Sequence, residues 1–297
     1  MTPEFLSYIA PARRYPQLWR LLAGLVVIGV VHVAWSALVM LGAGLMIGRG
    51  LIAAPPGGLS RETIGASPGM MLMLLATFAG MGIGTVLAAR LLHRRGLRSL
   101  IGPGRTALRH FLGGAALILA VNLLALAALV DPAAPEPALP MRLWLALLPL
   151  ALLGVLVQTG AEELVFRGYL QQQLAARFSS TLVWMLLPSL AFGMLHYEPG
   201  QMGANAWPVV AITALFGLIA ADLTARAGTL GLAWGLHFSN NLFALLLLSP
   251  QGDLSGLALY RMPFGADDTE TMPLLLAFDA VLLLAIWAIC RLALRRR

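Results

Sequence analysis

Long apolar runs alternate along the chain with short breaks rich in polar and turn-forming residues. Eight runs can be drawn, at about 21–47, 69–92, 110–130, 143–163, 182–196, 208–225, 229–248 and 272–290. Most are close to the about 20 residues that an α-helix needs to cross the hydrocarbon core of a bilayer. The breaks carry turn signals, as in Pro55-Pro56-Gly57-Gly58, Asp131-Pro132 and Glu198-Pro199-Gly200. This pattern predicts an all-α, polytopic membrane helix bundle of about eight transmembrane helices, with residues 1–297 in a single domain.

Composition strengthens this prediction. Hydrophobic residues make up 59% of the chain and charged residues only 11%, whereas soluble domains carry about 25% charged residues. The first run, Leu21 to Ile47, is too long for the apolar region of a signal peptide, which spans about 7–15 residues. The single cysteine, Cys290, excludes an intrachain disulfide and a cysteine-based metal site. We therefore expect an integral membrane protein whose first partner is the lipid bilayer.

The net charge of +7 is carried by arginine alone, because the chain has no lysine. The arginines lie between the apolar runs, which indicates orientation in a membrane and not a nucleic-acid partner. With the N-terminus inside, only Arg49, Arg61, Arg142 and Arg261 fall outside, and the other 16 of the 20 fall inside. Both termini are therefore predicted to be cytoplasmic. Exclusive use of arginine together with many alanines favours a bacterial cell (inner) membrane.

Three charges follow the nearly uncharged run from Met141 to Gly160: Glu162, Glu163 and Arg167. Charges at membrane depth are costly, and those that occur there pair with one another or mark a functional site. On a helix, Glu163 and Arg167 are four residues apart and share a face, so we expect them to pair. Glu162 is displaced about 100° around the helix and is free to point into the bundle. The plainer alternative is a structural ion network.

A second candidate is His196, with Phe192 one helical turn earlier on the same face. A turn near Phe178–Ser180 would fold the fourth and fifth runs into an antiparallel hairpin. Glu162 and His196 each lie 17 residues from Ser179, so both would stand about 25 Å from the turn. A carboxylate beside an imidazole can deprotonate a water. Alone, a histidine in this position is more often a packing residue.

The third candidate pair, His237 and Asn241, is four residues apart in the seventh run. Two donors on one helical face are suited to holding an oxyanion, although a polar contact between helices would use the same residues. Asn240 is rotated away from this face. Gly231 with Gly235, like Gly80 with Gly84, is expected to allow close helix packing. Asp279, midway along the last run, is ambiguous between a buried partner for another charge and a functional group.

Together, the motifs EExxxR (Glu162, Glu163, Arg167), FxxxH (Phe192, His196) and HxxxN (His237, Asn241) resemble the ordered signature of the CPBP family. This family comprises the CAAX prenyl protease and bacteriocin-processing (Abi) intramembrane endopeptidases. The resemblance covers about 80 residues within a motif-bearing core at about 141–248. It implies a glutamate-dependent peptidase without a cofactor, in which Glu162 and His196 activate water and His237 and Asn241 stabilise the oxyanion. Glu163, Arg167 and Phe192 would support the site, which is expected to open to the cytoplasm.

Two other readings stay open. Glu162, His196 and His237 could bind zinc in a membrane peptidase, although the chain has no HExxH motif. A non-catalytic bacteriocin-immunity or transport protein would also use buried glutamate and histidine, although paired halves with matching broken spans, which point to a transporter, are not evident. For a peptidase, we expect a peptide or membrane-protein substrate, with a prenylated CAAX substrate less favoured in a bacterium.

Overall fold

The computed structural model describes residues 1–54, 65–129, 135–252 and 254–295. The turns expected at Pro55–Gly58 and Asp131-Pro132 lie outside these residues. The α-helices are α1 Pro3–Ile9, α2 Leu18–Gly48, α3 Pro68–His93, α4 Leu97–Ile101, α5 Gly104–Leu129, α6 Met141–Glu163, α7 Gln172–Arg177, α8 Leu187–Met194, α9 Pro199–Met202, α10 Ala206–Ala227, α11 Gly231–Leu242 and α12 Thr271–Arg295. Wider π-type turns form η2 (Leu164–Gln171), η3 (Leu182–Leu186) and η5 (Phe243–Leu247), and 3-10 turns form η1 (Ala10–Arg14) and η4 (Gly203–Asn205). The short strands are β1 Glu136–Pro137, β2 Leu248–Gln251 and β3 Tyr260–Gly265.

The predicted all-α membrane bundle is confirmed, but the predicted count of eight spans is not. Each of the eight apolar runs forms helix. In the described part of the chain, however, only six helical stretches are long and apolar enough to cross a membrane. The two exceptions are the helix from Leu182 to Met194 and α11, which has 12 residues. Both carry candidate site residues, and both are too short to span about 30 Å at 1.5 Å per residue.

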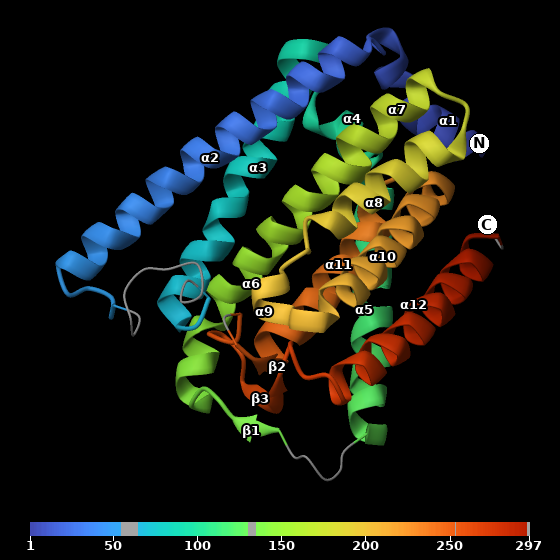
Figure 1. Cartoon of the computed structure of the whole chain (residues 1–297). Helices are drawn as coiled ribbons and strands as arrows, with labels where there is room; N and C mark the ends of the chain where they lie inside the picture. Colours follow the sequence, from blue (N-terminus) through green and yellow to red (C-terminus); the bar gives the residue numbers. More distant parts are fainter. Residues whose placement is uncertain (55–64, 130–134, 253, 296–297) are drawn as a thin grey trace.

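The helices pack in pairs that place sequence-distant runs side by side (Figure 1). α2 packs along α3, and α3 packs along α6. α11 packs along α5, and both α8 and α12 pack along α10. The glycines expected at close crossings lie at such contacts. A side chain at Gly231 would collide with the Ala107 carbonyl of α5, and one at Gly84 would press on the backbone of Ile28 in α2. Small residues therefore bring these helix axes together.

The connections gather at two ends of the molecule. At one end, here called the terminal end, Thr2 Oγ1 donates to the Ala225 carbonyl at 2.7 Å, and Leu230 N donates to the Ile101 carbonyl at 2.9 Å. Figure 1 shows the N- and C-terminal parts of the chain toward this same end. Both termini therefore lie toward one end of the bundle, and which side of the membrane that end faces stays a prediction.

At the opposite end, here called the sheet end, β1, β3 and β2 form a small sheet in that order. β1 pairs antiparallel with β3, and β2 pairs parallel with it. The loop before α12 is fastened here, because Asn205 Nδ2 donates to the Asp268 carbonyl at 2.8 Å. Through this sheet, β1, which precedes α6, is joined to β2, which follows α11 and η5. The sheet therefore ties together α6 and α11, the two helices that carry most of the candidate site.

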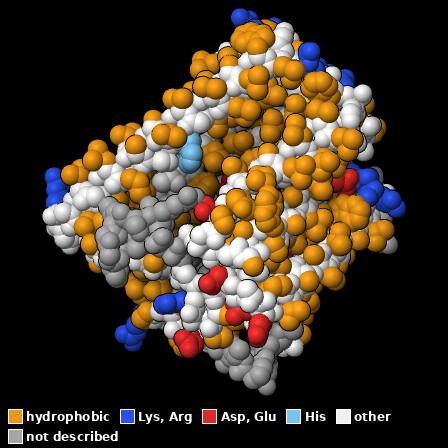
Figure 2. Space-filling view, in the orientation of Figure 1, with side chains coloured by type: hydrophobic (Ala, Val, Ile, Leu, Met, Phe, Trp, Pro, Cys, Tyr) orange, Lys and Arg blue, Asp and Glu red, His pale blue; other side chains and the backbone are white. Residues whose placement is uncertain are grey.

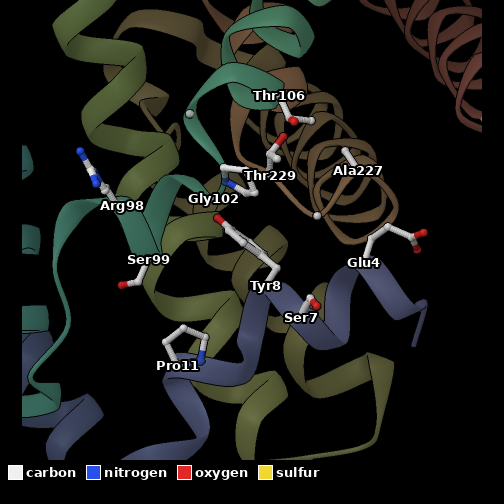
Figure 3. Close-up of a pocket in the computed structure, with 13 residues that line it drawn as sticks. Glu4, Ser7, Tyr8, Pro11, Arg98, Ser99, Gly102, Thr106, Ala227 and Thr229 are labelled. Atoms are coloured by element: carbon white, nitrogen blue, oxygen red, sulfur yellow. The ribbon is translucent and has the colours of Figure 1, made fainter.

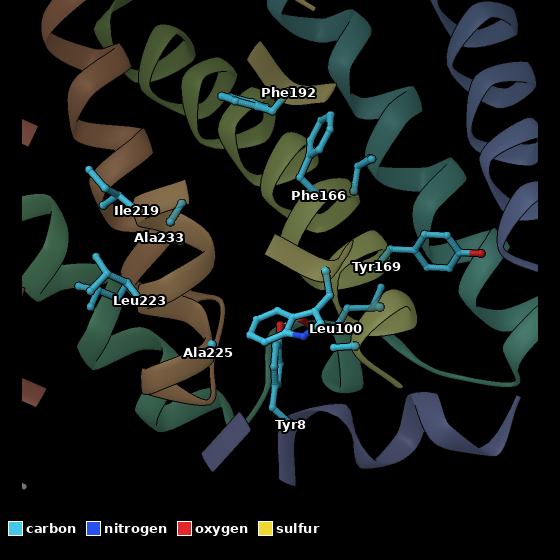
Figure 4. Close-up of a cluster of buried hydrophobic side chains, with 14 of the residues drawn as sticks. Tyr8, Leu100, Phe166, Tyr169, Phe192, Ile219, Leu223, Ala225 and Ala233 are labelled. Atoms are coloured by element: carbon cyan, nitrogen blue, oxygen red, sulfur yellow. The ribbon is translucent and has the colours of Figure 1, made fainter. Parts of the chain in front are cut away.

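Apolar side chains dominate the face seen in Figure 2, and most of the acidic side chains in that view lie toward the sheet end. Beneath the surface, one buried cluster joins the N-terminal helix to η2, α8, α10 and α11 (Figure 4). The rings of Phe166 and Phe192 meet edge to face with centroids 5.1 Å apart. An apolar surface with a packed interior of aromatic and small side chains is what a bilayer-embedded bundle requires.

Candidate functional site

The first motif lies where α6 passes into the π-type turn η2. Arg167 NH1 donates to Glu163 Oε1 at 2.7 Å, so the ion pair expected from the four-residue spacing forms. Arg167 is 2% exposed and Glu163 is fully buried. The guanidinium also donates to the Gly217 carbonyl at 3.3 Å and lies 4.7 Å from the ring centroid of Phe192. A charge at this depth is tolerable because it is paired, hydrogen-bonded and stacked on an aromatic ring.

Glu162 points away from this pair, as its helical position predicts. It is 8% exposed. Its Oε1 accepts a hydrogen bond from Gln158 Nε2 at 2.8 Å. Its Oε2 accepts none in the described part of the chain, and lies 3.5 Å from His237 Nε2. One carboxylate oxygen is thus fixed, and the other is presented to an imidazole.

His237 bridges the two glutamates from α11. Its Nδ1 lies 2.9 Å from Glu163 Oε1. Because an ionised carboxylate only accepts hydrogen bonds, Nδ1 must carry a proton, and in the neutral ring Nε2 carries the lone pair. The ring packs edge to face against Phe192 and Phe216, with centroids 5.8 and 5.1 Å away. The imidazole is therefore held in one orientation, with Nε2 directed at Glu162.

His196 lies in the turn directly after α8. Its Nδ1 hydrogen-bonds the Phe192 carbonyl at 2.9 Å, which leaves Nε2 with the lone pair in the neutral ring. The ring centroids of His196 and Phe192 are 4.9 Å apart, so Phe192 covers one side of the imidazole. Within the described residues, Glu162 contacts the other imidazole, that of His237. Joint activation of a water by Glu162 and His196 stays a prediction. Phe192 lies between the two imidazoles and contacts both.

A small cavity of about 90 Å³ lies beside these side chains. His196 lines it from the turn after α8, and His237 and Asn241 line it from α11; Phe192 and Phe216 form apolar walls, and Glu162 is not among its lining residues. This volume exceeds the about 30 Å³ that one water occupies, and the polar walls supply partners for it. Two imidazoles and the Asn241 amide thus meet at one water-sized space, which Glu162 adjoins through His237. That Glu162 shares a water there stays a prediction.

Three further residues line the cavity, and the sequence analysis did not predict any of them there. Asn240, predicted to be rotated away, lines the cavity beside Asn241, and Thr213 joins them from α10. Asp279 of α12 also lines it and makes no ion pair within the described residues. It is therefore not the buried partner of a distant charge, and its carboxyl group faces the same space as the two imidazoles.

Gln158 is the residue that sequence reasoning missed. It is 7% exposed and links Glu162 to Asn241, whose Nδ2 donates to Gln158 Oε1 at 2.9 Å. A signal was present in the sequence. Gln158 is a polar residue in an apolar run, four positions before Glu162, and so on the same helical face.

The depth of the cavity follows from helix positions. Phe216 is ten residues into α10, near its middle, and Asp279 is eight residues into α12, about 12 Å from the sheet end. His237, in contrast, is six residues into α11, about 9 Å from the terminal end. The cavity therefore lies near the middle of the bundle, and the side to which it opens stays a prediction.

A larger cavity of about 830 Å³ opens at the terminal end (Figure 3). It lies among α1, α4 and the turn between α10 and α11, and none of the seven motif residues lines it. Its wall holds one acid, Glu4, and one base, Arg98, among hydroxyl and apolar groups. Nothing in this lining forms a recognisable catalytic arrangement.

The zinc reading has no preformed ligand set in the described part of the chain. No three histidine, cysteine, aspartate or glutamate side chains there are placed to hold one ion. Glu162 and His237 meet, and the Nδ1 bond of His196 to a backbone carbonyl leaves its Nε2 with the lone pair. Binding zinc through these three residues would require them to move closer around one point.

Comparison with known proteins supports the family resemblance. Residues 143–243, about a third of the chain, match the family described as type II CAAX prenyl endopeptidase Rce1-like. This segment contains every motif residue from Glu162 to Asn241. The uncharacterized protein YyaK of Bacillus subtilis (strain 168) is 29% identical over 180 residues, covering 58% of this chain. The chain spans 59% of the length of that relative. No solved structure matches the chain. The resemblance to CAAX-type membrane proteases is therefore confirmed over the motif-bearing segment.

Proposed function

We propose that this protein is an intramembrane endopeptidase in which Glu162 activates a water molecule for attack on a peptide bond. The observation that carries the proposal is the continuous network joining Asn241, Gln158, Glu162, His237 and Glu163 beside a water-sized polar cavity. Hydrolysis needs a base, a charge stabiliser and a sequestered water. The family match supports a protease, and the network offers a group for each task.

In the proposed reaction, a water in the cavity gives a proton to Glu162 Oε2, the oxygen left without a hydrogen bond in the described part of the chain. His196 faces the same cavity and helps to orient this water. The hydroxide adds to the carbonyl carbon of the substrate, and a tetrahedral oxyanion forms. When the C–N bond breaks, the proton held by Glu162 passes to the leaving amine.

The oxyanion would be stabilised by His237 and Asn241. Since Nδ1 of His237 donates to Glu163, His237 can donate through Nε2 only as an imidazolium. Glu163 is itself held by Arg167. The EExxxR motif therefore serves two purposes in the proposal, one carboxylate acting as base and the other supporting the oxyanion donor.

The proposed substrate is a peptide or a segment of a membrane protein that enters the bilayer-embedded site. The apolar rings of Phe192 and Phe216 on the cavity wall suit an unfolded apolar segment. The proposed site opens toward the cytoplasm, because His237 lies about 9 Å along α11 from the terminal end, where the arginine distribution predicts the inner side.

The proposal is tested with purified protein reconstituted in lipid and a panel of labelled peptides and prenylated peptides. Glu162→Gln is expected to lower cleavage about 10²- to 10⁴-fold, the contribution typical of a general base. Glu136→Gln, which removes an exposed carboxylate in β1, is the matched control and should cleave normally. Equal cleavage by Glu162→Gln and wild type would refute the assignment.

The same preparation separates the remaining readings. Loss of cleavage on chelation, restored by zinc alone, would support the zinc peptidase. A protein that cleaves nothing in the panel, yet keeps an immunity or transport phenotype in cells with Glu162→Gln, would support a non-catalytic role. Preference for prenylated over plain peptides would identify a CAAX-type substrate.

A further inference from the structure

Gln158 joins two groups of the candidate site that belong to different helices. It stands one helical turn before Glu162 in α6 and is almost fully buried. Its Nε2 donates to Glu162 Oε1 at 2.8 Å, and its Oε1 accepts from Asn241 Nδ2 of α11 at 2.9 Å. Both ends of one amide are thus used, and both partners are residues of the proposed reaction.

The direction of these hydrogen bonds is fixed by Glu162. An ionised carboxylate can only accept, so the Gln158 amide must turn its nitrogen to Glu162. Its oxygen then faces Asn241, which must turn its own nitrogen toward Gln158. An amide nitrogen carries two hydrogens. One hydrogen of Asn241 is used by Gln158, and the second remains for a group in the cavity that Asn241 lines.

We propose that Gln158 is a positioning residue that sets both the base and the oxyanion donor of this site. It holds Glu162 Oε1, so that Oε2 is the oxygen presented to His237. It also fixes Asn241 with its N–H₂ group, not its carbonyl, toward the reacting atoms. This inference rests on the proposed function, because it assigns roles to Glu162 and Asn241 in the same reaction.

A merely structural Gln158 would satisfy buried polar groups and nothing more. Its removal would then lower stability and leave turnover of the folded protein unchanged. Positioning has a different signature. Misplaced Glu162 and Asn241 act on the transition state, so kcat falls while KM for the substrate changes little.

The primary variant is Gln158→Met, which keeps the length of the side chain and removes both hydrogen bonds. We expect kcat to fall roughly 10- to 100-fold with KM within about twofold, the range for losing a hydrogen bond to a charged group. Thr159→Val is the matched control. Thr159 is the next buried polar residue in α6 and accepts from Trp234 Nε1 at 3.2 Å, away from Glu162. This control should keep kcat even if it loses stability.

A second variant, Gln158→Glu, covers the case in which Gln158→Met fails to fold. Glutamate has the same size and, when ionised, still accepts from Asn241, but it cannot donate to Glu162 and opposes it with a like charge. We expect kcat to fall here as well. Full kcat in either folded variant would overturn the inference.

A double-mutant cycle with Asn241→Ala tests whether Gln158 acts through Asn241. If it does, the double variant should lose less activity than the product of the two single losses. Independent, multiplying losses would contradict this route. Failure of the inference is distinct from failure of the proposed function, because the latter would appear as normal cleavage by Glu162→Gln.

Discussion

Arg167 shows most directly how single residues shape this protein. It is a full positive charge buried at membrane depth, and every part of its guanidinium environment compensates for burial. Glu163 supplies the counter-charge, the Gly217 carbonyl an acceptor and Phe192 an aromatic face. Removing one member of a buried ion pair leaves the other charge uncompensated, which typically costs about 3–5 kcal/mol. Arg167 therefore stabilises the fold as well as orienting Glu163 toward His237.

Arg167→Met is accordingly expected to lower the apparent melting temperature in detergent by several degrees and to abolish cleavage. Arg167→Lys should have a melting temperature and a cleavage rate between those of the wild type and Arg167→Met. Lysine keeps the charge but cannot reproduce the planar guanidinium that reaches both Glu163 and Gly217. Thermal unfolding followed by circular dichroism measures both effects. Arg142→Met, an exposed change at the start of α6, should stay within about 0.5 kcal/mol of wild type. A wild-type melting temperature for Arg167→Met would show that the pair does not contribute.

The element that carries the proposed oxyanion donors, His237 and Asn241, is α11, and its position depends on glycine. A side chain at Gly235 would collide with the Phe111 carbonyl of α5, and one at Gly231 with the Ala107 carbonyl. Because the obstacles are backbone atoms, they cannot rotate away. The close approach of α11 to α5 therefore fixes where His237 and Asn241 stand relative to α6.

Gly235→Ala is expected to force α11 away from α5, with a loss of about 1–3 kcal/mol, the usual cost of overpacking, and a large loss of cleavage. Gly113→Ala is the matched control on α5, because a methyl group there meets no atom within 4 Å. It should be neutral or slightly stabilising, as alanine favours a helix interior over glycine by about 0.5–1 kcal/mol. Melting curves and cleavage rates are measured for both variants. Equal stability and cleavage in Gly235→Ala and Gly113→Ala would show that the close contact with α5 does not position α11.

A second element-scale feature lies where the chain enters α12, the helix that carries Asp279. Asp268 Oδ1 accepts hydrogen bonds from the backbone N–H of Thr271 at 2.6 Å and of Glu270 at 3.0 Å. These bonds, that from Thr271 foremost, hold the pKa of the Asp268 carboxyl below its usual value. Because the pKa of Asp268 is lower in the folded protein, its ionised carboxylate stabilises the fold at every pH above the unfolded pKa of about 3.9. This stabilisation is lost as the pH falls through the lower, folded pKa.

Below about pH 4, the first turn of α12 is therefore expected to fray in the wild type. Asp268→Asn keeps an uncharged acceptor at every pH and should fray little more at pH 3 than at pH 6. The measurement is amide hydrogen exchange at Glu270 and Thr271. At each pH, the exchange rate in the wild type is divided by the rate in Asp268→Asn. A ratio independent of pH would contradict the assignment of these bonds to the ionised carboxylate.

At the scale of the whole molecule, the grouping of connections at two ends gives the membrane orientation a direct test. Arg98 lies exposed at the terminal end and Arg261 exposed at the sheet end. Since arginine-rich loops stay inside, a cysteine replacing Arg98 is expected to react with an impermeant thiol reagent from the cytoplasmic side only. A cysteine replacing Arg261 should react from the outer side only. The background is Cys290→Ser, whose native thiol is 5% exposed.

A third cysteine, replacing Thr213, reports on the cavity itself. Thr213 lines the cavity, and the proposed opening toward the cytoplasm predicts reaction from the same side as position 98. Reaction from the side of position 261 would instead support a site that opens to the outer side. Reaction of positions 98 and 261 from one side would contradict the two-ended arrangement.

The sequence by itself determined the membrane class, the helical architecture, the Glu163–Arg167 pair and the membership of His237 and Asn241 in one helical face. Each rests on spacing within one helix or on composition, which tertiary contacts do not alter. Only the tertiary structure decided that Glu162 meets His237 and not His196, that Gln158 connects Glu162 to Asn241, and that Asp279 faces the cavity. These depend on the rotation and depth of separate helices. Rotation and depth are set by packing, such as the glycine contacts of α11 with α5, and not by periodicity along one run.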